Sequence, residues 1–286
     1  MKNKEYIKYS QSILKFAEKF NYNLCNGGFE NFPLLDFEKK IFEHIDKNNF
    51  SIIHKARQMH MDSIMATYVA WKLIFENNYK VVYISPNIKH SQEFIERVAR
   101  IINFYFSKKI YKRKMLNENF VHKISDEPRI ISGIIFKISK NKIELPNNSF
   151  LKITTSGADS LRGENIDMVI LSKAAFIQNL RSLMAMTIAT LRMTKSRIIV
   201  YSTGDGKNNF FYMLWKESIK NYKRITKRRL LLEKNKPQYK IDDSFLFYPY
   251  ELHYSENPVY NENWTYIETA LIGERAFRSE YNLEFI

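Results

Sequence analysis

Short, continuously apolar segments that alternate with amphipathic ones constrain the fold of this 286-residue chain more than any other feature. The apolar segments have the length of strands and lie at residues 51–54, 80–85, 167–171 and 196–202. They alternate with segments whose apolar residues recur at helical spacing, at residues 63–77, 90–107, 177–193 and 208–221. Because strands that are apolar throughout must be covered on both faces, the pattern predicts an α/β fold with a mainly parallel sheet sandwiched by helices.

The alternation occupies the middle of the chain, so the sequence divides into three predicted regions. Residues 1–32 are expected to form an N-terminal helix over residues 4–20, followed by a linker. The α/β core is expected to cover residues 33–222 and to open with a helix over residues 36–47. The alternation of strands and helices ends at residue 222, which predicts a small, lid-like C-terminal subdomain of mixed strands and helices over residues 223–286.

Composition excludes several classes of protein. Hydrophobic residues make up 45% of the chain, with 21 Phe and 18 Tyr, which is ample for a packed core. No apolar run approaches the roughly 20 residues that a membrane span needs, and no signal peptide is visible behind the N-terminal lysines. Cys25 is the only cysteine, so an internal disulfide framework is excluded. These features predict an intracellular protein with no membrane partner.

The net charge of +15 is concentrated in two blocks. Residues 107–142 contain 10 Lys or Arg against 3 Asp or Glu, and residues 216–240 contain 10 against 2, which accounts for the whole excess. A focused basic excess predicts a polyanionic partner, most simply double-stranded DNA. The candidate contacts are the densest runs of each block, Lys112, Arg113, Lys114 and Lys227, Arg228, Arg229. The alternative is that these lysines are solvated and reflect a compositional bias.

Five short motifs lie where strands of the predicted sheet end or where a helix begins. They cover residues 36–38, 56–63, 156–163, 168–177 and 201–206, and an aromatic-rich helix follows the last one. In order and approximate spacing they resemble the motifs of the large terminase subunits of tailed phages, nearest to the myovirus type. The resemblance spans roughly residues 33–286. It implies a P-loop NTPase fold, and it implies viral DNA packaging in the cytoplasm of a bacterial host cell.

The resemblance assigns a role to each motif. Nucleotide binding falls on Phe37, Glu38, Arg57, Gln58, His60, Met61, Asp62 and Ser63. The carboxylates that hold Mg²⁺ and orient the attacking water would stand at Ser172 and Lys173, and arginines of the family's site are retained at Arg57 and Arg162. The motif that couples hydrolysis to movement corresponds to Ser202, Thr203, Gly204, Asp205 and Gly206.

At the chemically decisive positions this chain departs from the family. The glycine, lysine and hydroxyl residue of the phosphate loop, or Walker A motif, are replaced by His60, Met61 and Asp62. Ser172 and Lys173 stand in place of the two carboxylates of the Walker B motif. Glu38 replaces the adenine-contacting glutamine and lacks its amide donor. Phosphoryl transfer depends on positioned charge, so the sequence predicts a pseudo-ATPase without ATP, Mg²⁺ or another metal. We also expect the loop over residues 56–62 to lack the wide anion-cradling turn, since His60 replaces the residue best suited to a positive φ.

Alternatives to this interpretation stay open. The chain could be an active packaging ATPase in which Lys173 replaces the lost lysine, or a decoy that interferes with a phage terminase. Partner candidates beside DNA are the portal protein and an active terminase subunit, and the chain could form an oligomer. The family's nuclease domain would follow Ile286, and no such domain is expected within these residues.

Other residue groups carry weaker signals. His54, His60, His90 and His122 lack metal-ligand spacing and are expected to be scattered surface or core histidines. The aromatic cluster over residues 210–215 has helical spacing, which favours core packing over a base-stacking platform.

Overall fold

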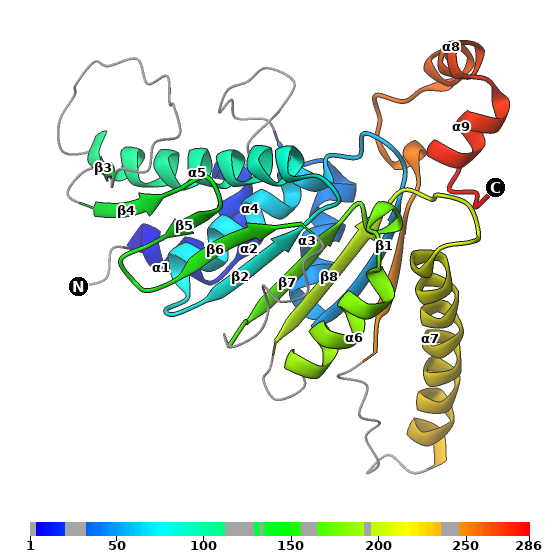
Figure 1. Cartoon of the computed structure of the whole chain (residues 1–286), viewed down its shortest axis with the longest axis horizontal. Coiled ribbons are helices and arrows are strands. Elements are labelled where there is room, and N and C mark those ends of the chain that lie inside the picture. The colour runs from blue at the N-terminus through cyan, green and yellow to red at the C-terminus, as the bar shows by residue number, and fades with distance from the viewer. Residues whose placement is uncertain are drawn as a thin grey trace. The chain divides into compact units, whose positions relative to one another are not determined.

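The computed structural model describes residues 4–20, 33–111, 129–131, 134–155, 165–191, 196–235 and 246–286 (Figure 1). The chain divides into two compact units. The first combines the described parts of residues 1–42, 60–155 and 165–167, and the second those of residues 43–59 and 168–286. Helix α3 (Asp36–Lys47), which confirms the helix predicted there, is divided between the two units.

The first unit contains five strands in the order β3-β4-β5-β6-β2. β2 and β6 are parallel, whereas the other neighbouring pairs are antiparallel. The strands are β2 (Lys80–Ile84), β3 (Arg129–Ile131), β4 (Ile134–Ile138), β5 (Lys142–Glu144) and β6 (Phe150–Thr154). The four helices that lie entirely in this unit are α1 (Lys4–Ser10), α2 (Ile13–Phe20), α4 (Met61–Phe75) and α5 (Ile88–Tyr111).

The N-terminal helix is interrupted, contrary to the expectation of one helix over residues 4–20. α1 ends at Ser10 and α2 begins at Ile13, because the Ser12 hydroxyl accepts the Lys15 N–H at 3.3 Å and starts a new helix. The apolar face of α2 is nonetheless buried, and Phe16 packs edge-on against Phe75 of α4 at 5.8 Å.

The second unit contains four strands, all parallel, in the order β7-β8-β1-β9. They are β1 (Phe50–Lys55), β7 (Met168–Ser172), β8 (Arg197–Ser202) and β9 (Tyr248–Leu252). The helical elements are η2 (Ala174–Phe176), α6 (Leu180–Leu191), α7 (Phe210–Asn235), η3 (Tyr254–Glu256), α8 (Glu262–Ile272) and α9 (Glu274–Glu280). Strands β1, β7 and β8 are almost wholly buried, as their apolar sequences predict.

The end of the regular pattern lies later in the chain than residue 222. α7 continues to Asn235, so the predicted boundary between residues 222 and 223 falls within this helix. β9, whose sequence includes Pro249, then adds a parallel strand beside β1, with Pro249 opposite Ile52. Proline fits there because β9 is an edge strand.

The predicted fold class, α/β with mainly parallel strands covered by helices, is confirmed. None of the helices in the described ranges is long and apolar enough to cross a membrane.

Candidate functional site: the loop between β1 and α4

Residues 56–60 form the loop that leads from β1 into α4, the position of a phosphate loop. Gln58 and His60 both have left-handed backbone conformations, with φ of 58° and 52°. The reason given for the expected loss of the anion-cradling turn, that His60 is unsuited to a positive φ, is therefore wrong. Histidine is among the residues that enter this region more readily than most, and the His60 side chain is also held by a partner.

The partner of His60 is Glu38, within the first unit. The carboxylate Oε1 of Glu38 lies 3.1 Å from His60 Nδ1, and Oε2 accepts the Leu35 N–H at 2.9 Å. Glu38 is only 5% exposed, and the Phe37 ring lies 6.0 Å from the His60 ring. The two positions that the sequence assigned to adenine and phosphate binding thus contact each other.

Asp62 supplies the negative charge at the start of α4. It lies in the first turn of the helix, where His60 makes no side-chain capping bond, and its Oδ2 lies 3.5 Å from His90 Nε2. The positive end of the helix dipole favours an anion there, which is the reason that phosphate binds at such positions. Asp62 therefore places a protein carboxylate where a nucleotide phosphate would be expected.

The neighbouring residues of α4 do not offset this charge. Met61 is buried and brings no cation, and the buried Ser63 hydroxyl has no hydrogen-bond partner in the structure. In the residues that the structure covers, no group of three or more His, Cys, Asp or Glu side chains could hold a metal ion.

The start of the loop belongs to the second unit and is bonded to that unit's C-terminal elements. The Ala56 N–H donates to the Leu252 carbonyl of β9, and the Arg57 N–H donates to the Glu280 carbonyl of α9, both at 2.8 Å. The Tyr260 hydroxyl donates to the Gln58 carbonyl at 3.2 Å. Sequence reasoning missed these contacts, because backbone acceptors leave no signal in side-chain identity. Arg57 itself is exposed.

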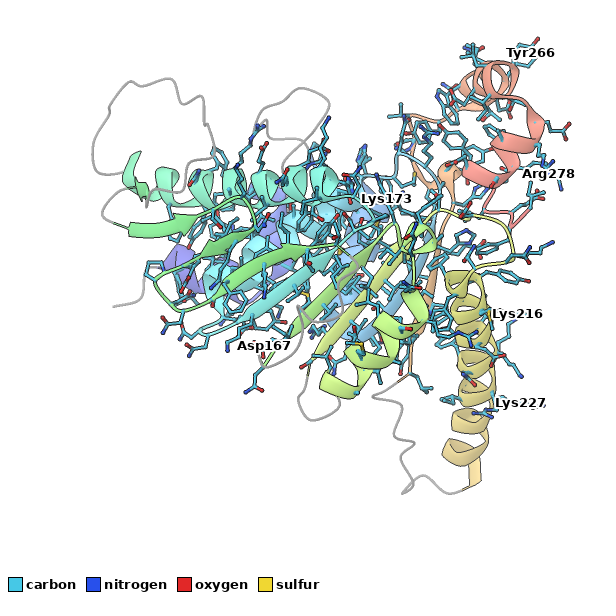
Figure 2. All side chains as sticks on the ribbon, viewed as in Figure 1. Asp167, Lys173, Lys216, Lys227, Tyr266 and Arg278 are labelled. Carbon is cyan, nitrogen blue, oxygen red and sulfur yellow. The ribbon has the colours of Figure 1, made fainter. Side chains whose placement is uncertain are left out.

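The segment predicted as the Walker B motif lies at the end of β7, also in the second unit. Ser172 is fully buried, whereas Lys173 is exposed and adopts a left-handed conformation with φ of 51° (Figure 2). Two residues further on, the Ala175 N–H donates to Ser202 Oγ at 3.1 Å. This bond joins the segment after β7 to Ser202 at the end of β8, and neither Ser172 nor Lys173 carries a carboxylate.

Residues 202–206, predicted as the coupling motif, are packed against residues 284–286. A Cβ atom added to Gly204 would lie 3.4 Å from His54 Nε2, and one added to Gly206, whose φ is +64°, would lie 3.2 Å from the Ile286 carbonyl. Thr203 is partly exposed and Asp205 is exposed, with the Asp205 carbonyl accepting from Asn209 Nδ2 at 2.6 Å. The positive φ and the 3.2 Å approach explain glycine at Gly206, whereas a Cβ on Gly204 would meet its neighbours at ordinary van der Waals distances.

His54 lies in the core beside this motif. Its ring stacks on Phe285 at 4.2 Å and contacts Trp215 at 5.3 Å. Burial, with a smaller contribution from the Lys55 charge, lowers the pKa of His54 to about 4. Phe211 and Trp215 are buried, which confirms core packing for these two members of the cluster, whereas Phe210 and Tyr212 are partly exposed.

Other predicted site residues are only partly covered. Arg162 and the run Lys112, Arg113, Lys114 lie outside the described residues. Lys227, Arg228 and Arg229 lie on α7, where Lys227 is exposed.

Comparison with known proteins supports the fold. No protein-family model matches the sequence, and no curated protein matches it. Among solved structures, the large terminase of bacteriophage HK97 matches with a TM-score of 0.59 and 13% identity, over 96% of this chain and 54% of that one. The ATPase domain of the large terminase of Thermus phage P74-26 matches with a TM-score of 0.54 and 16% identity, over 85% and 92% of the two chains.

A nucleotide-bound structure matches as well. The large terminase of a thermophilic bacteriophage, solved in complex with ADP, matches with a TM-score of 0.54 and 10% identity, over 89% of this chain and 54% of that one. This chain therefore spans about half the length of the HK97 protein and of the ADP-bound terminase. It has the fold of phage large terminase ATPase domains.

Proposed function

We propose that this chain is a terminase large subunit-like component of phage DNA packaging, or of a phage-derived system, that does not hydrolyse ATP. It acts by binding double-stranded DNA or a protein of the packaging apparatus, such as the portal or an active terminase subunit. The observation that carries the proposal is the pair of contacts Glu38–His60 and Asp62–His90, at positions that would otherwise receive a nucleotide.

Electrostatics at the start of α4 oppose a bound triphosphate. Two unit charges of the same sign about 4 Å apart repel by about 4 kcal/mol at the effective dielectric of a protein surface. If a phosphate of the nucleotide lay at that distance from Asp62, this repulsion would lower the affinity of the protein for the nucleotide by about a thousandfold. A dissociation constant in the micromolar range would become millimolar.

The residues of both motifs fit ATP and Mg²⁺ poorly. Binding a base at Glu38 would disturb a buried carboxylate whose two oxygens are already used by His60 and Leu35. A metal bridging the phosphates needs a carboxylate from the second motif, where Ser172 and Lys173 stand. We therefore derive no hydrolytic step for this chain.

Isothermal titration calorimetry tests the proposal. The unaltered protein and the Asp62→Asn variant are titrated with ATP in the presence of Mg²⁺. We expect no resolved binding by the unaltered protein and a measurable gain by Asp62→Asn, which keeps the shape of the side chain and removes its charge. A low-micromolar dissociation constant for the unaltered protein would refute the proposal.

A further inference from the structure

α7 carries a stripe of five exposed cations along one face. Its members follow one another at intervals of three or four residues, apart from one adjacent pair, and are Lys216, Lys220, Lys223, Arg224 and Lys227. Side chains at these intervals lie on the same side of an α-helix. Figure 2 shows Lys216 and Lys227, near the two ends of the stripe, on the side of α7 that points away from the strands of the same unit. We call this set the α7 stripe.

The opposite face of α7 fixes the orientation of the stripe. Phe211, Trp215 and Ser218 are 0%, 6% and 5% exposed. Trp215 packs against His54 of β1 at 5.3 Å, so the helix cannot turn its cations inward without exposing its core residues. The α7 stripe is therefore a preformed surface that a partner can reach without rearrangement.

The stripe keeps its positive charge. Glu217 is the only acidic residue between Phe210 and Lys227. It approaches Lys220 at 3.8 Å, but the two side chains are 60% and 72% exposed. An ion pair so open to solvent is worth at most about 1 kcal/mol and leaves the lysine available. Four lysines and one arginine thus face solvent, and Glu217 is the one acidic side chain paired with them among the residues that the structure describes.

The dimensions of the stripe match a duplex backbone. From Lys216 to Lys227 the helix rises roughly 17 Å. Duplex DNA presents one phosphate charge about every 1.7 Å of its axis, so a rigid line of this length can meet several phosphates.

The composition of the stripe argues against single strands. Proteins that bind single-stranded nucleic acid add aromatic rings on which bases stack. The two tyrosine rings nearest the α7 stripe are already packed against other rings. Tyr222 lies 5.9 Å from Tyr248, and Tyr212, one turn before Lys216 and 6.0 Å from its Nζ, lies 4.8 Å from Phe285.

We propose that the α7 stripe binds the phosphate backbone of duplex DNA without reading its sequence. The inference rests on the proposed function, in which DNA is a partner, and assigns the contact to a defined surface. The α7 stripe takes the place of the contiguous run Lys227, Arg228, Arg229 as the predicted DNA contact in this part of the chain. Of these three residues, Lys227 is the one that belongs to the α7 stripe.

Fluorescence anisotropy with two unrelated duplexes, measured over a series of salt concentrations, tests this assignment. The stripe variant is Lys216→Ala, Lys220→Ala, Lys223→Ala. A matched control removes the same charge from exposed lysines of the first unit, with Lys15→Ala, Lys19→Ala, Lys89→Ala. Each lost phosphate contact lowers the slope of log K against log salt by about 0.9, so the stripe variant should flatten it by about 2.7. The control should leave the slope near that of the unaltered protein.

Four results would overturn the proposal: equal effects of the two triple variants, absence of duplex binding at 50 mM salt, tighter binding of a single strand, or tighter binding of duplex RNA. Circular dichroism of both variants establishes that they are folded; the substituted lysines are all exposed, so folding should be preserved. Nucleotide titration remains a separate measurement. A negative result for DNA binding by the α7 stripe therefore does not affect the pseudo-ATPase proposal. Conversely, low-micromolar ATP binding would refute the pseudo-ATPase proposal and would not affect the proposal that the α7 stripe binds DNA.

Discussion

Acid should destabilise this protein through His54, which the fold holds neutral. Burial and the Lys55 charge lower its folded-state pKa from 6.5 to about 4. In the unfolded chain the imidazole takes up a proton as the pH falls below 6.5, whereas in the folded chain it takes up a proton only as the pH approaches 4. The unfolded state therefore binds more protons between pH 6.5 and 4, and stability falls as the pH drops through that window.

The magnitude follows from the two pKa values. Each unit of pKa difference corresponds to about 1.4 kcal/mol. With pKa values of 6.5 and about 4, His54 lowers the free energy of unfolding by about 2 kcal/mol at pH 5 and about 3 kcal/mol at pH 4, relative to pH 7.5. His44, whose pKa burial also lowers to about 4, adds a contribution of similar size.

Urea unfolding at pH 7.5 and pH 5 measures the effect. His54→Leu should shrink the difference in unfolding free energy between the two pH values by about 2 kcal/mol, whatever it does to stability at pH 7.5. Other titrating groups shift both proteins alike, and pH 5 keeps most carboxylates ionised. His253→Asn, at a solvent-accessible histidine, controls for the loss of an imidazole. If His54→Leu keeps the full pH dependence of the unaltered protein, burial does not hold His54 neutral and the reasoning fails.

Three further perturbations test the site, the basic runs and the coupling motif. A variant that restores the family's residues should bind nucleotide measurably in calorimetry; it carries His60→Gly, Met61→Lys, Asp62→Thr, Ser172→Asp and Lys173→Glu. If the variant folds correctly but gains no affinity for nucleotide, the resemblance does not extend to the site. Replacing Lys112, Arg113 and Lys114 with Ala should flatten the salt dependence of DNA binding by about 2.7 if all three contact phosphate. The Lys227, Arg228, Arg229 triple should flatten it by at least about 0.9, the contribution of Lys227 on the α7 stripe, and unchanged slopes would mark both runs as solvated. Gly206→Ala should lower the free energy of unfolding by about 1–2 kcal/mol more than Gly204→Ala, because only Gly206 has a positive φ, and equal effects on urea midpoints would contradict that strain.

Much of the fold could be predicted from local sequence. β2, β7 and β8 lie within a residue or two of their predicted positions because each is a continuous apolar run that can be stable only when covered on both faces. The departures from the terminase motifs are also visible in the residues alone. Met61 can carry no charge and Ser172 can offer no carboxylate, whatever surrounds them.

Only the tertiary structure decided how the altered site is arranged. Glu38 pairs with His60 across 22 positions, and Asp62 pairs with His90 of the following helix, because the fold brings these segments together. β9 forms from a segment with a proline and partly exposed residues, since its stability comes from pairing with β1 rather than from its own apolarity. The sequence by itself therefore determined which charges the site lost, while packing between distant segments determined that the site's own side chains took their place.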